Sequence, residues 1–273
     1  MRRRKITTKL FVIAFYFIAQ QSFAQKMYVN VHAGYNFNSA PLTSINSTSN
    51  GSSSTTYDRV DISLGKGVNL DAAFGYMFNK HFGTELAVSY LIGGTTTLTN
   101  NTTSSKSTTN FSSSMLRFMP SIIMSTEFGK IYPYAKFGLI LGSGAYTITE
   151  DEKSTSSGST NFTSTKYDGG FAFGYFSGFG VSYKINDKIS LLSEISIVSL
   201  SYAPSKGEVT ESKSNGVDML PNMTIRDKQT EYSDNYTVDN NSSSNTSVAR
   251  KSIKQSLPFS SIGFSLGVRY TLR

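Results

Sequence analysis

From residue 27 onward, apolar and polar side chains alternate with a period of two in eight separate stretches of the sequence. Alternate residues of a strand lie on the same face of a sheet, so this period predicts β-strands. Because no stretch of comparable length shows the 3.6-residue period of an amphipathic helix, we predict an all-β protein. The expected strands cover residues 27–37, 68–78, 82–92, 115–127, 131–145, 169–184, 189–202 and 257–271.

The two faces of these strands carry different side chains. One face is almost uninterrupted Val, Leu, Ile, Phe and Tyr, whereas the other holds Gly, Ser and single charges. The second face would be solvated poorly but suits a narrow interior, where large and small groups interlock. If the apolar face points into hydrocarbon, only a closed barrel leaves no unpaired backbone edge. We therefore predict an eight-stranded, antiparallel, up-and-down transmembrane β-barrel, with a soluble secreted β-protein of reversed faces as the alternative.

The charges on the polar face are the first candidate site. Three acids face three bases, and a plug of salt bridges is favoured over a gated polar path because side chains fill an eight-stranded barrel. We expect Glu85, Lys136 and Glu194 to share one layer, and Asp71 to pair with Arg117 nearer the long connections. The full predicted lumen network is Asp71, Glu85, Arg117, Lys136, Glu194, Arg269 and His32.

The connections between the strands alternate between short and long. The short ones, at 78–82, 128–131 and 185–189, each contain Asn, Asp or Gly and place a lysine just before the returning strand. This pattern predicts tight hairpin turns at one common end of the barrel.

The long connections are tracts of Ser, Thr, Asn and Gly. They bury little apolar area, so we expect them to be solvated and mobile at their tips, with the parts next to the strands extending the hairpins. They are either a surface for a protein or cell-surface partner or a hydrophilic brush, and the last one has the mixed charge that favours a partner site. Their approximate bounds are 38–67, 93–114, 146–168 and 203–256.

Aromatic side chains gather near both ends of the expected strands. In membrane barrels, outward Tyr and Phe form belts at the two headgroup levels. Two belts one membrane apart are hard to explain in a soluble fold. The predicted belt residues are Tyr35, Phe37, Phe78, Phe82, Tyr90, Phe173, Tyr175, Tyr183 and Tyr270.

The first 24 residues have the composition of a secretory signal. A cluster of five bases precedes an apolar run at 10–19, and small residues stand at Ser22 and Ala24. The run is about half of the roughly twenty residues that a spanning helix needs. We expect cleavage between Ala24 and Gln25, which leaves the barrel at residues 25–273.

Composition excludes several classes of function. The chain has no Cys, which rules out a disulfide scaffold and thiol sites. The net charge of +8 falls to +3 without the five signal bases, which is too little to indicate a nucleic-acid partner. Neither a metal-ligand spacing nor a phosphate-binding Gly loop is present, and we expect no cofactor and no metal.

The two histidines, His32 and His81, are the only candidates for catalytic residues of an enzyme. Barrel-embedded enzymes use a His with Ser or carboxylates near the outer rim. His81 is in a short turn at the opposite end, and His32 is expected inside the wall. We therefore predict no enzyme and no catalytic residue.

The closing stretch Gly263-Phe-Ser-Leu-Gly-Val-Arg-Tyr270, together with Gly34-Tyr35 and Gly75-Tyr76, resembles the small bacterial outer-membrane β-barrel family that contains OmpA- and OmpX-like barrels. The Ser-, Thr- and Asn-rich loops are similar to those of proteins from the Bacteroidetes. The resemblance implies outer-membrane lipids as surroundings, insertion by the barrel-assembly machinery, periplasmic termini and short turns, and extracellular long loops. The predicted role is structural or interactive through those loops, with a narrow porin-like channel for small hydrophilic solutes as the alternative.

Overall fold

The computed structural model describes residues 26–49, 54–237 and 245–272. The predicted signal segment, with its cleavage pair Ala24 and Gln25, lies outside the described residues. The described part contains no helix with the length and apolar character needed to cross a membrane.

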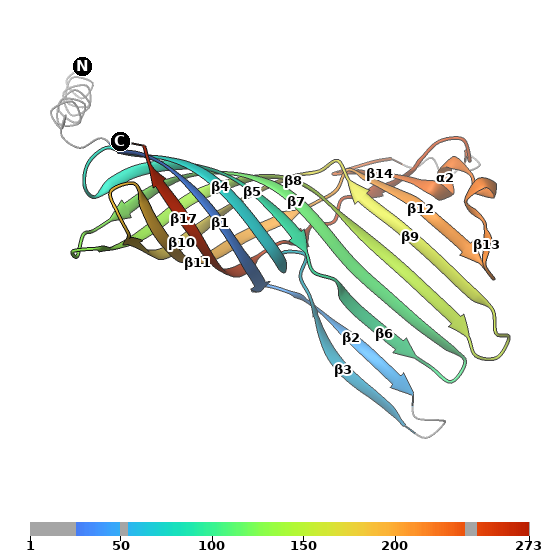
Figure 1. The fold of residues 1–273 in the computed structure, drawn as a ribbon. Coiled ribbons are helices and arrows are strands. Elements are labelled where there is room, and N and C mark those ends of the chain that lie inside the picture. The colour runs from blue at the N-terminus through green and yellow to red at the C-terminus, as the bar shows by residue number, and fades with distance from the viewer. Residues whose placement is uncertain (1–25, 50–53, 238–244, 273) are drawn as a thin grey trace, which may run out of the picture.

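Eight strands close into a ring, in which each strand pairs antiparallel with the next along the chain (Figure 1). The last strand pairs with the first from Tyr28–Thr271 to Asn38–Ser261, which completes the barrel. The prediction of an eight-stranded, antiparallel, up-and-down barrel is confirmed. The ring strands are β1 (Lys26–Asn38), β4 (Gly67–Met77), β5 (Phe82–Gly93), β7 (Ser105–Ser125), β8 (Ile131–Ser154), β10 (Phe171–Lys184), β11 (Ile189–Tyr202) and β17 (Ser261–Thr271).

The apolar face of the ring strands points outward. Phe74, Phe137 and Leu266 are 47%, 53% and 58% exposed, whereas Glu85 on the opposite face is 2% exposed. An outer wall of this composition is stable against hydrocarbon and unstable against water. The alternative of a soluble barrel with reversed faces is therefore wrong.

The interior is less polar than the sequence pattern suggested. A small apolar group, made of Ile123, Tyr134 and Leu192, lies near the short turns. From the middle of the barrel to the other end, a larger apolar cluster fills the lumen and its mouth. We call it the apolar plug: Leu64, Ala73, Ala87, Leu91, Met115, Met119, Ile140, Tyr146, Ala172, Phe176, Val198, Leu200, Tyr202 and Phe259.

The long connections form an ordered sheet beyond the barrel, which we call the extension. The strands β7 and β8 continue past the ring over 21 and 24 residues in all. On one side β7 pairs with β6, and on the other β8, β9, β12 and β14 pair in turn. The added strands are β6 (Thr96–Asn101), β9 (Thr160–Asp168), β12 (Lys206–Ser214) and β14 (Gln229–Ser233).

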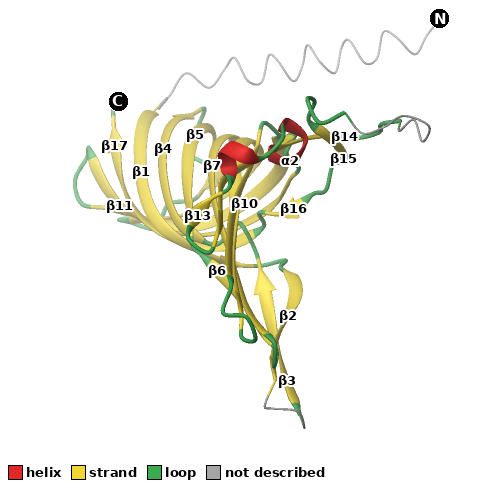
Figure 2. Ribbon diagram, turned by 90° about the vertical axis from the view of Figure 1, so that its right-hand side faces the viewer, coloured by secondary structure: helices red, strands yellow, loops and turns green. Residues whose placement is uncertain are grey.

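A separate hairpin of β2 (Leu42–Ser49) and β3 (Thr55–Ile62) projects away from the barrel and touches β6 at its tip (Figure 2). The remaining elements are short. They are β13 (Val217–Asp218), η1 (Leu220–Asn222), α2 (Ile225–Lys228), β15 (Arg250–Ile253) and β16 (Leu257–Pro258).

The long connections extend the hairpins well beyond the parts next to the ring, and strands cover most of their described residues. Backbone pairing with the overhanging parts of β7 and β8 satisfies their N–H and C=O groups, and Thr is a good strand former. Residues 205–250 contribute β12 and β14, which pair antiparallel. The tips at 50–53 and 238–244 lie outside the described residues.

Candidate functional site

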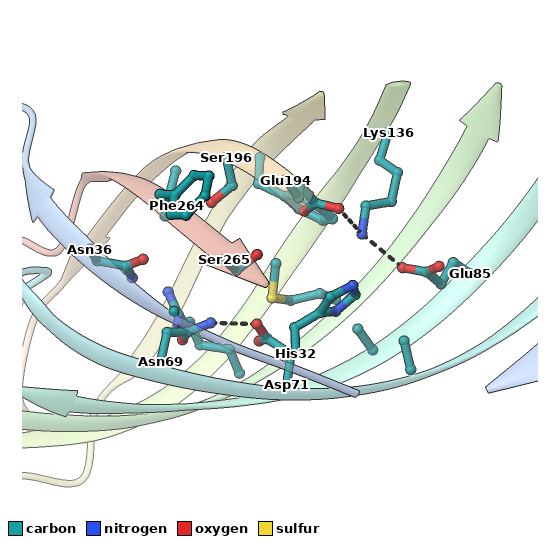
Figure 3. Close-up of a pocket in the computed structure, with 17 residues that line it drawn as sticks. His32, Asn36, Asn69, Asp71, Glu85, Lys136, Glu194, Ser196, Phe264 and Ser265 are labelled. Atoms are coloured by element: carbon teal, nitrogen blue, oxygen red, sulfur yellow. Dashed lines mark hydrogen bonds and ion pairs between the residues drawn. The ribbon is translucent and has the colours of Figure 1, made fainter. Parts of the chain in front are cut away.

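A buried ion-pair layer crosses the lumen. β5 supplies Glu85, β8 supplies Lys136 and β11 supplies Glu194, all on the inward face of their strands (Figure 3). The Lys136 Nζ atom lies 3.0 Å from Glu85 Oε1 and 2.7 Å from Glu194 Oε2. Each of the three residues is at most 7% exposed. The structure thus places in one layer the three charges that the sequence grouped.

Side chains from strands two positions away around the ring add hydrogen bonds to both carboxylates. Tyr28 Oη and Asn30 Nδ2 donate to Glu85 Oε2 over 3.1 and 2.8 Å, and Tyr134 Oη donates to Glu194 Oε2 over 2.9 Å. Buried charges are tolerated when they are paired and bonded in this way. The sequence analysis missed these three donors, although they occupy inward positions that the alternation identifies.

Two inward glycines make room for the tyrosine donors. A Cβ atom on Gly75 would collide with the Tyr28 ring, and one on Gly180 would collide with the Tyr134 ring. Glycine at these positions allows the close approach of ring and backbone that the layer requires.

Asp71 and Arg117 do not form the direct pair that the sequence suggested. Asn69 stands between them: its Nδ2 atom donates to Asp71 Oδ2 over 2.5 Å, and its Oδ1 atom accepts from Arg117. Arg117 also donates to Ser89 Oγ over 2.9 Å. An amide bridges the two charges because the Asn side chain both donates and accepts. Asn69, two residues before Asp71 on the same face, was the signal that the sequence analysis did not use.

Arg269 and His32 complete the predicted network, but neither forms an ion pair among the described residues. Arg269 Nε donates to Asn30 Oδ1 over 2.9 Å, and its guanidinium lies 3.9 Å from the centre of the Tyr28 ring. His32 is buried opposite Asp71 and Gly267, and its Nε2 atom has no hydrogen-bond partner in the described part of the chain.

The space left around His32 is small. His32 lines a cavity of about 40 Å³ together with Asp71, Arg117 and Lys136 (Figure 3). A cavity of this size has room for ordered water but not for a solute. Within the described ranges, no three His, Cys, Asp or Glu side chains are grouped closely enough to hold a metal ion.

The other histidine lies at the short-turn end. The backbone carbonyl of Ser125 lies 3.1 Å from His81 Nδ1. Among the described residues, no hydrogen bond joins either histidine to a Ser hydroxyl or a carboxylate, so the geometry of a nucleophile–base pair is missing.

All nine predicted belt residues lie on the outward face of the barrel or at its short turns. Their exposed fractions run from 36% for Tyr35 to 61% for Phe173. Two further aromatic residues, Phe128 and Phe171, are even more exposed at the strand ends and were not predicted. The nine are Tyr35, Phe37, Tyr90, Phe173 and Tyr175 toward the extension, and Phe78, Phe82, Tyr183 and Tyr270 toward the short turns.

A row of tyrosines joins the barrel mouth to the extension, and sequence reasoning missed it. The rings of Tyr146 and Tyr167 stack at 4.6 Å, and the Tyr232 ring lies 6.2 Å from that of Tyr167. Gly207 lies beside the last two rings, and a side chain there would press on both. Burial raises the pKa of Tyr167 and of Tyr232, so both phenols stay neutral across the physiological range.

A closed ring of strands with an apolar outer wall and a filled interior defines a transmembrane β-barrel. The chain belongs to the family described as "Outer membrane protein beta-barrel domain", whose model matches residues 10–218. The predicted family and the bacterial outer membrane as location are thereby confirmed, and lipid surrounds the outer wall. An origin in the Bacteroidetes stays a prediction.

Several solved structures are similar to the chain at low identity. OprG from Pseudomonas aeruginosa is 13% identical, with a TM-score of 0.45 over 91% of this chain and 96% of that chain. Neisserial surface protein A is 13% identical, with a TM-score of 0.36 over 90% and 98%. Ail of Yersinia pestis is 10% identical, with a TM-score of 0.32 over 91% and 98%. No curated protein matches the chain.

Proposed function

We propose that this outer-membrane barrel is closed to solutes, catalyses no reaction and works through its extension, as a surface that a protein or another cell contacts. The observation that carries this proposal is the filled lumen. The apolar plug and the buried Asp71–Asn69–Arg117 group together fill one half of the barrel, and the Glu85–Lys136–Glu194 layer crosses the lumen below them. A conducting path would need a continuous wetted passage, and apolar constrictions exclude ions by losing water.

In this proposal the short turns and termini face the periplasm and the extension lies outside the cell. The extension is rich in Ser, Thr and Asn, which hydrate well, whereas the two sets of aromatic belt residues bracket the wall between the ends. Insertion is assigned to the barrel-assembly machinery, as for other barrels of this kind.

The extension suits recognition because paired strands present its side chains in fixed positions. The strand β12 carries charges of both signs: Lys206 and Lys213 near its two ends, with Glu208 and Glu211 between them. Such a surface can be complementary to a charged partner without reordering on contact, which lowers the entropic cost of binding.

Planar-bilayer recording of the refolded chain tests the closed lumen. The wild type is expected to give no unit currents, and the double variant Met119→Ala/Phe176→Ala, which empties part of the plug, is expected to give intermittent ones. Regular current steps in the wild type would instead favour the narrow channel for small hydrophilic solutes. Protease treatment of intact cells tests the orientation, since only the extension and the β2–β3 hairpin should be cleaved.

A further inference from the structure

A second cavity opens at the short-turn end, apart from the ion-pair layer. It has a volume of about 450 Å³, which is within the range of small-molecule sites, and strand ends and turns from all around the ring line it. Four lysines line it against two carboxylates: Lys26, Lys80, Lys184 and Lys188 against Glu127 and Asp187. We call this cavity the basic mouth.

The lysines reach the basic mouth from two kinds of position. Lys26 and Lys184 lie at the ends of β1 and β10 and line the cavity with Tyr28 and Ser182, inward residues of the same strands. Lys80 and Lys188 come from the short turns and belong to the lysine repeat that those turns share. All four lysines line the cavity, which distinguishes them from headgroup contacts on the outer wall.

In both turns an asparagine side chain fixes the backbone around the lysine. Asn79 Oδ1 accepts the backbone N–H groups of His81 and Phe82, each over 2.8 Å. Asn186 Oδ1 accepts those of Lys188 and Ile189, each over 2.9 Å. Side-chain-to-backbone bonds of this type fix the turn, so the rim of the mouth is ordered before any ligand arrives.

Most of the positive charge in the mouth is uncompensated. Lys184 is bound to Asp187 at 2.7 Å, and Glu127 accepts a hydrogen bond from Tyr132 Oη over 3.0 Å. Across the described ranges, Lys26, Lys80 and Lys188 have no ion-pair partner. The guanidinium of Arg269 also lines the cavity, but its charge interacts with Glu85 of the ion-pair layer. Several cations around one concavity focus a positive potential into it.

We propose that the basic mouth binds a phosphate-bearing anion, with Lys26, Lys80 and Lys188 as its charged contacts. Lysine ammonium groups bind phosphate as mobile point charges, and the cavity has room for a compound that carries a phosphate or diphosphate group. The same chemistry is offered by a lipid headgroup that turns inward at the rim and by a soluble phosphate compound. This site is independent of the role of the extension.

Calorimetric titration of the full chain in neutral detergent micelles with inorganic pyrophosphate, at constant ionic strength, tests the proposal. The wild type is expected to bind saturably with one site, and Lys80→Ala/Lys188→Ala to lose about tenfold or more in affinity. The matched control is Lys106→Ala/Lys153→Ala, which removes the same charge from a cross-strand pair at the far end of the extension. This control should bind as the wild type does.

Absence of saturable heat, or an equal loss of pyrophosphate affinity in both double variants, would overturn the proposal. An acidic protein would then be the occupant of the mouth to test. A second arm separates the two sources of phosphate. If the ligand is a lipid headgroup, micelles that contain phosphatidylglycerol weaken pyrophosphate binding to the wild type. If it is a soluble anion, the lipid leaves the affinity unchanged. Both outcomes of this arm support the site and differ only in its natural ligand.

Discussion

At the scale of single residues, Lys136 is the group on which the lumen layer depends. It is the shared partner of two buried carboxylates, and the tyrosine and asparagine donors around them do not supply charge. Replacing Lys136 by Met keeps most of the volume but leaves two negative groups facing each other in a closed lumen. Removing one partner is therefore expected to destabilise the barrel by more than the intact ion pairs stabilise it.

We expect Lys136→Met to lower the free energy of unfolding by about 3–5 kcal/mol, the usual cost of an unpaired buried charge. Urea titration in micelles, followed by the heat-dependent gel shift of folded barrels, measures the change. The triple variant Glu85→Gln/Lys136→Met/Glu194→Gln is the control, because it removes all three charges together and should recover most of the loss. A triple variant as unstable as the single one would mean that packing, not charge, explains the effect.

At the scale of elements, the extension depends on two strands that do not stop at the membrane. Thr149 lies in the part of β8 beyond the ring and pairs with both Asn110 of β7 and Ser164 of β9. A central position of this kind needs its backbone N–H, which proline lacks. Order in β9 and β12 should therefore depend on β8 at a point well outside the barrel.

We expect Thr149→Pro to unravel the outer part of the extension and to leave the barrel folded. Amide hydrogen exchange should speed up by more than tenfold in residues 147–166 and stay unchanged in the ring strands, because the lost pairing is confined to the overhang. Thr149→Ala keeps the N–H group and should exchange as the wild type does. Loss of the gel shift in the proline variant would contradict the independence of the two parts.

The eight ring strands and their two faces were predictable because the alternation of apolar and polar residues identifies both the strands and the residues that share a face. Phe74 and Glu85 had only to be assigned to opposite faces, and lipid then determined which face was outside. The extension was not predictable in this way, since a Ser- and Thr-rich strand such as β9 has no apolar face. Its pairing depends on the neighbouring strand β8, which continues beyond the membrane. The Asn69 bridge was missed for a related reason: counting charges does not reveal a neutral group that joins them.

At the scale of the whole molecule, the exposed apolar surface has two different surroundings. Leu266 in the middle of β17 is 58% exposed on the barrel wall, and Val217 in β13 is 61% exposed on the extension. The two side chains are thus about equally exposed. Leu266 faces hydrocarbon and Val217 faces water, so the same substitution should destabilise the protein by different amounts at the two positions.

We expect Leu266→Arg to destabilise the barrel by about 2–4 kcal/mol in a lipid bilayer, the cost of an arginine on the lipid face near the midplane. Val217→Arg should change stability by less than about 0.5 kcal/mol, as surface substitutions usually do. Reversible urea unfolding from phosphatidylcholine vesicles measures both variants against the wild type. If the two arginines cost the same, the wall of the barrel does not face hydrocarbon, and the layered arrangement of plug, ion pairs and belts would need another explanation.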